Sequence, residues 1–116
     1  MKRVKWTKTT IAKWHRRTFR DCTTNEQRLK CSREAEEYFA AQTFDERMKE
    51  LADFYIANSA LGIRFSDASG ALVCRILEDS PLWDELCSEI QDKMEINSQR
   101  SWEKRNGEWR HYEKLA

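Results

Sequence analysis

The sequence predicts an all-α fold, a single small domain over residues 1–116 built as a bundle of four to six helices. Two segments, 23–26 and 43–46, have the Thr-x-x-Glu spacing of a helix capping box. Apolar residues recur at intervals of three and four, the spacing of a buried helical face. The only proline, Pro81, follows Ser80, as expected of an N-cap and a first helical position.

The amino-terminal segment divides into an arm and a helix. Residues 1–8 lack helical periodicity, and we expect a basic, extended arm there. A helix over 9–22 follows, capped by Thr9 or Thr10. Its buried stripe recurs at i, i+3, i+4, i+7, i+8 and i+11, and comprises Ile11, Trp14, His15, Thr18, Phe19 and Cys22.

Two further helices are expected from the capping boxes, the first continuing to about residue 41 and the second ending at Gly62. Two structures are compatible with the segment 63–77. Ser66 and Asp67 could cap a helix that buries Leu72 and Ile76, or the segment could form a short β-hairpin. We favour the helix.

The carboxyl-terminal part is expected to contain two helices. The first starts at Ser80 and buries an apolar stripe that continues to Met94. The last covers 97–116, where an aromatic seam of Trp102, Trp109 and Tyr112 docks late or frays.

Charge is strongly segregated along the chain, although the net charge is only +1. Residues 1–30 carry ten Lys and Arg against two acids, whereas residues 31–96 carry six against fifteen. A basic end and an acidic middle indicate either an anionic ligand for the basic end or an internal match between the two.

Several functional classes lack their signatures. No apolar run reaches the roughly 20 residues that span a bilayer, so we expect no membrane contact and a cytoplasmic location. The four cysteines show no close pair typical of a zinc or redox site, and no glycine-rich phosphate loop occurs. We therefore expect no enzyme activity, no cofactor and no metal.

The leading hypothesis is an accessory protein that binds nucleic acid, DNA or RNA, largely without sequence specificity. Basic side chains recur at i, i+3, i+4 and i+7 on the face opposite the buried stripe, where they could meet phosphates. Arm residues would add charge, and Trp6 could stack on a base. The candidate residues are Lys13, Arg16, Arg17, Arg20, Lys5, Lys8 and Trp6.

The alternative is a protein interaction module, an inhibitor or adaptor, for instance one encoded by a mobile element. Its contacts would be an acidic row at i, i+4 and i+7, or the carboxyl-terminal aromatic residues, which could equally close the core. The acidic row could hold a cation, but no His joins it, and a solvated face or a contact for a basic partner is expected. The residues are Glu46, Glu50, Asp53, Trp102, Trp109 and Tyr112.

Overall fold

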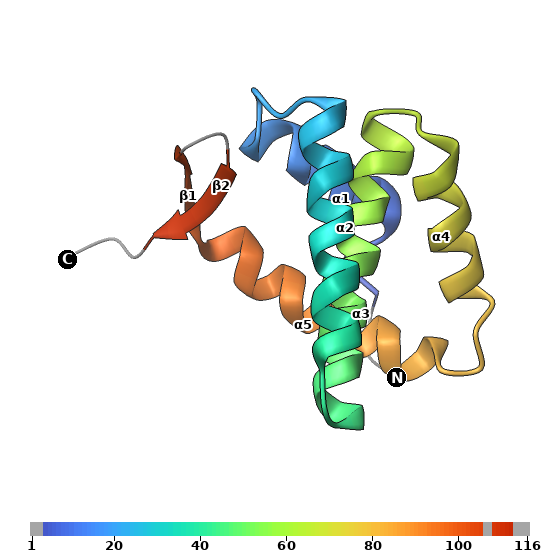
Figure 1. The fold of residues 1–116 in the computed structure, drawn as a ribbon. Coiled ribbons are helices and arrows are strands. Elements are labelled where there is room, and N and C mark those ends of the chain that lie inside the picture. The colour runs from blue at the N-terminus through green and yellow to red at the C-terminus, as the bar shows by residue number, and fades with distance from the viewer. Residues whose placement is uncertain (1–3, 106–107, 113–116) are drawn as a thin grey trace.

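The computed structural model describes residues 4–105 and 108–112, and it confirms the small all-α bundle. Helix α3 is central, because α1, α2, α4 and α5 all contact it. In Figure 1, α2 and α3 run side by side, and a short hairpin follows the end of α5. The elements are α1 (Lys8–Thr18), α2 (Thr24–Ala40), α3 (Phe44–Ser59), the π-helical turn η1 (Ala60–Arg64), α4 (Ala68–Glu78), α5 (Trp83–Gln99), β1 (Ser101–Arg105) and β2 (Glu108–Tyr112).

Helix α1 begins one residue earlier and ends four residues earlier than the expected 9–22. Thr7 is its N-cap, and Thr7 and Thr10 form a reciprocal capping box, so neither Thr9 nor Thr10 holds the cap position. The buried stripe is confirmed, except that Thr18 is only half-buried.

Helices α2 and α3 start as the sequence indicates. The Thr23 side chain accepts from Glu26 N–H while the Glu26 carboxylate accepts from Thr23 N–H. The Thr43 side chain likewise accepts from Glu46 N–H, but the Glu46 carboxylate accepts from Gln42 N–H, so the capping box expected at 43–46 is only half formed. Satisfying these free N–H groups stabilises each helix start by about 1 kcal/mol.

The segment after α3 is helical rather than a β-hairpin. Gly62 does not end the helical segment as expected, because it lies within η1, which directly follows α3. A Cβ built on Gly62 would lie 2.6 Å from the backbone nitrogen of Ala71, so this glycine permits η1 and α4 to touch through their backbones. The expectation that Leu72 and Ile76 are buried was wrong, since they are 58% and 59% exposed on α4.

The carboxyl-terminal predictions need two corrections. Helix α5 starts at Trp83 with Leu82 as N-cap, and the Ser80 side chain accepts from Leu82 N–H in the turn before it. The helix expected over 97–116 is wrong for the described residues beyond α5, which ends at Gln99: 101–105 and 108–112 pair as an antiparallel hairpin, with Trp102 opposite His111. The rest of that expected helix, 106–107 and 113–116, lies outside the described residues.

The core consists of a main apolar cluster with members from α1, α3, α4 and α5, and a smaller one formed by Cys31, Ala57 and Leu61. The main cluster holds the largest buried side chains. Its fully buried members include Ile11, Ala52, Leu86, Ile90 and Met94. No helix among the described residues is long and apolar enough to span a bilayer.

Candidate functional site

Four cationic side chains of the amino-terminal segment form one exposed surface, here called the basic ridge: Lys13, Arg16, Arg17 and Arg20. The first three lie on α1, and Arg20 lies just beyond its end. No other side chain in 4–105 or 108–112 forms an ion pair with any of them. The ridge therefore presents its full positive charge to solvent.

The buried face of α1 determines which face of the helix, and so the ridge, points to solvent. Ile11 is fully buried, and Trp14 and Phe19 meet edge to face with ring centroids 5.3 Å apart. The α1 helix cannot rotate without exposing these rings, whose burial stabilises by about 2 kcal/mol each.

The arm contributes less free charge than the sequence indicated. Lys8 Nζ pairs with Glu78 at 3.0 Å, and Lys5 Nζ lies 3.8 Å from Glu95 on an exposed surface. Trp6 packs partly against the core, while its backbone N–H and carbonyl bond the Gln91 side chain at 2.7 Å each. Lys2 and Arg3 of the expected arm lie outside the described residues.

Arm and ridge nevertheless meet at one place. Lys5, Trp6, Thr10, Lys13 and Arg17 line a shallow surface depression of about 230 Å³. Three cations beside an indole are the composition of sites that hold a phosphate next to a base. Arg16 and Arg20 of the ridge do not line this depression.

Arg64 has no local signal in the sequence, yet its side chain binds the end of α1. From η1, its guanidinium donates to the carbonyls of Phe19 at 2.8 Å, Arg20 at 3.2 Å and His15 at 3.3 Å. The His15 and Phe19 carbonyls also accept the backbone N–H groups of Phe19 and Cys22, so Arg64 adds side-chain donors to a helix end that the backbone satisfies in part. These contacts also place the loop that carries Arg20.

His15 and Cys22 are packing residues in this arrangement. Burial and the charge of Arg64 lower the pKa of His15 to about 3, so the ring is neutral at neutral pH. Arg64 Nη1 lies 3.0 Å from His15 Nδ1, and because a guanidinium only donates, Nδ1 accepts. Burial raises the pKa of Cys22, which keeps it a thiol.

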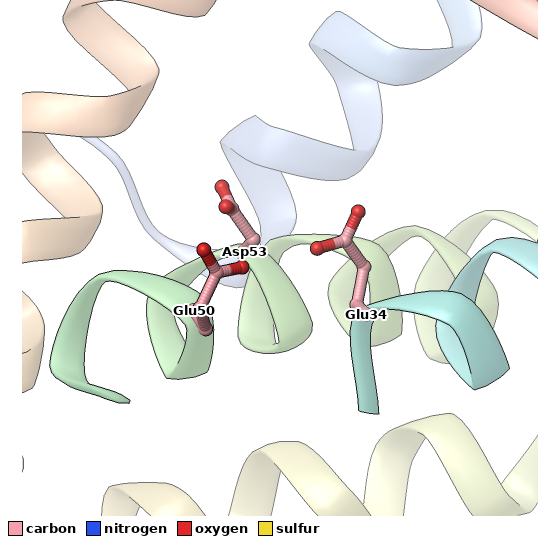
Figure 2. Close-up of side chains that lie close together, drawn as sticks. All are labelled: Glu34, Glu50 and Asp53. Carbon is pink, nitrogen blue, oxygen red and sulfur yellow. The ribbon is translucent and has the colours of Figure 1, made fainter. Parts of the chain in front are cut away.

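The acidic row is split between two surroundings. Glu46 is exposed, and its carboxylate accepts from Gln42 N–H before the start of α3. Glu50 and Asp53 instead meet Glu34 of α2, and the three carboxylates form what we call the acidic cluster (Figure 2). Sequence spacing on α3 alone could not reveal Glu34, because it comes from another helix.

Trp102 and Trp109 pack against the core. This agrees with the second interpretation of the aromatic seam, in which these residues close the core instead of binding a partner. Trp102 and Trp109 each lie 5.1 Å from Phe19 between ring centroids, on the buried side of the hairpin. Tyr112 is the last residue of β2.

Two surfaces of opposite charge therefore stand out on the described part of the chain, the basic ridge on α1 and the acidic cluster between α2 and α3. Comparison of the chain with protein-family models, with curated proteins and with solved structures finds no match.

Proposed function

We propose that this protein is a cytoplasmic accessory protein that binds DNA or RNA through the basic ridge, largely without sequence specificity. The observation that carries the proposal is the exposure of four cations, three on one face of α1 and Arg20 just beyond its end, with no ion partner among residues 4–105 and 108–112. Several basic side chains elsewhere, such as Lys8 and Arg28, pair with the protein's own acids.

The dimensions of the ridge suit a phosphate backbone. From Lys13 to Arg17 helix α1 advances about 6 Å at 1.5 Å per residue, and Arg20 follows just beyond the helix end, which is enough to meet at least two successive phosphates of one strand. Affinity would come mainly from release of condensed counterions, and contacts of this kind do not read base edges.

The test is a titration of labelled duplex DNA and single-stranded RNA at several salt concentrations, followed by fluorescence anisotropy. Replacing Arg16 and Arg17 together by Gln removes two phosphate contacts. The slope of log affinity against log salt is negative, and its magnitude should then decrease by about 1.8 for duplex and about 1.4 for single strands.

A matched control is Arg75→Gln, an exposed arginine on α4 away from the ridge, which should leave the slope unchanged. Failure to bind either nucleic acid at low salt would refute the proposal. So would a slope that responds equally to the control and to the ridge variant.

A second candidate function is binding to a protein partner, and the exposed apolar face of α4 favours it. Leu72 and Ile76 are one turn apart, and both are more than half exposed. A protein captured from lysate after nuclease treatment, and lost with the Leu72→Asp/Ile76→Asp double variant, would support this function over nucleic-acid binding.

A further inference from the structure

The acidic cluster brings three carboxylates from two helices to one point. Glu34 projects from α2, and Glu50 and Asp53 project from α3 toward the same space (Figure 2). One oxygen from each carboxylate lies within 4.8 Å of an oxygen from each of the others. Like charges at this separation repel, so the arrangement needs compensation.

Two oxygens of the cluster are buried without any hydrogen-bond donor. They are Oε2 of Glu34 and Oε2 of Glu50. The Glu34 side chain is only 6% exposed, and its other oxygen, Oε1, is held by Lys30 Nζ at 2.7 Å. A buried carboxylate oxygen with no partner is costly, and native proteins normally satisfy such atoms. The orphaned oxygens therefore indicate a missing positive partner at this point.

The lysines near the cluster do not balance its charge. Lys30 pairs with Glu34, and Lys93 Nζ pairs with Asp53 at 3.2 Å. Glu37 of α2 adds a fourth carboxylate, because it interacts directly with Glu50. Two ammonium groups therefore pair with two of these four carboxylates.

We propose that Glu34, Glu50 and Asp53 bind one divalent cation, with Ca²⁺ preferred to Mg²⁺, and that the ion ties α2 to α3. Carboxylate oxygens without sulfur or imidazole are the ligands of hard cations. Two oxygens on opposite sides of Ca²⁺ are about 4.6–5.2 Å apart, against about 4.0–4.2 Å for Mg²⁺. A cluster that spans up to 4.8 Å accepts Ca²⁺ without contraction.

The site is separate from the basic ridge, so its test does not depend on nucleic-acid binding. The full chain is stripped with EDTA, and its thermal midpoint is measured with CaCl₂, MnCl₂ or MgCl₂. Calorimetric titration of the same ions gives the affinity. With three carboxylate ligands we expect a dissociation constant of about 0.1–1 mM, and a midpoint rise of about 5 °C at ten times that concentration.

The diagnostic variant is Glu50→Gln, with Asp53→Asn as a second variant. Glu50→Gln removes a like charge, so its midpoint without ions should equal or exceed that of the wild type, while its response to Ca²⁺ disappears. Glu36→Gln, an exposed position on α2 two residues from Glu34, is the matched control and should keep the full response.

Three results would overturn the proposal. One is the absence of heat and of a midpoint shift with all three ions. Another is a Ca²⁺ response that survives in both Glu50→Gln and Asp53→Asn, which would put the ion elsewhere. The third is a midpoint that rises as the pH falls while no ion has an effect, which would show that shared protons compensate the cluster.

Discussion

The pH dependence of stability should reveal the buried, neutral state of His15. Burial and Arg64 lower its folded-state pKa to about 3, whereas the unfolded chain has a histidine pKa of about 6.5. Between these values the unfolded chain binds the extra proton. Stability that is present above pH 6.5 is therefore lost progressively as the pH falls toward 3.

The magnitude follows from the two pKa values. Each pH unit within the window costs up to about 1.4 kcal/mol, and the step from about pH 7 to about pH 5 costs about 2 kcal/mol through His15 alone. The carboxylates titrate in the same range, so total stability does not isolate this contribution. A comparison with a variant that lacks the imidazole does.

His15→Gln is the suitable perturbation, because the amide stays neutral and its oxygen can still accept from Arg64. Urea unfolding, followed by tryptophan fluorescence, gives the free energy of unfolding of both proteins at each pH. At neutral pH the variant should be less stable, because it loses the ring contacts to Phe19 and Phe65. By about pH 5 the difference should shrink by about 2 kcal/mol.

The control is Arg75→Gln, at an exposed position on α4, which removes no group that titrates between about pH 7 and about pH 5 and should follow the wild-type pH dependence. A difference between wild type and His15→Gln that stays constant from about pH 7 to about pH 5 would refute the neutral, buried assignment.

Three further outcomes follow from the packing. Gly70→Ala should lower the free energy of unfolding by about 1–3 kcal/mol in urea unfolding, because its Cβ would lie 2.7 Å from the Gly62 backbone nitrogen. Thr43→Ala should cost about 1 kcal/mol in the same assay through loss of the α3 cap. Alkylation of the native protein at neutral pH, mapped by mass spectrometry, should label half-buried Cys87 before Cys74, whose pKa is raised to about 11 by burial.

The parts of the fold that the sequence predicts well are those set by neighbours along the chain. The Thr23 and Thr43 caps depend on residues three positions apart, and the buried stripe of α1 depends on helical spacing. Such interactions remain local whatever the rest of the chain does. Long-range contacts leave no comparable trace, and Arg64 bonds carbonyls more than forty residues away.

The carboxyl-terminal error has a different origin, because a local signal was present. Asn106-Gly107 is a dipeptide typical of tight β-hairpins, and it separates two aromatic segments. Spacing of seven between Trp102 and Trp109 suggested a helical seam. In the hairpin both rings instead face Phe19, because the register pairs Trp109 with Lys104 and Trp102 with His111.

The exposed face of α4 shows why the buried face of a helix is harder to predict than the presence of the helix. Leu72 and Ile76 fit a helical stripe as well as their buried neighbour Cys74 does. Which side of α4 faces the core is decided by the contact of Gly62 with Gly70 and Ala71, where the two backbones meet. Close backbone contact brings one face inward and leaves the leucine and isoleucine outside.

The basic ridge carries a mutual repulsion that the packing of α1 does not require. Lys13 and Arg17 are like charges four residues apart on α1, and such a pair on a helix is destabilising by a few tenths of a kcal/mol. Arg64 brings another cation to the carboxyl-terminal end of α1, where burial and the charge of Arg16 lower its pKa. The α1 carboxyl terminus attracts cations through its dipole, but by no more than about 1 kcal/mol each, and the half-buried Arg64 already occupies its carbonyls. The exposed guanidinium groups therefore add repulsion that the fold does not need, and a polyanion laid along α1 would relieve it.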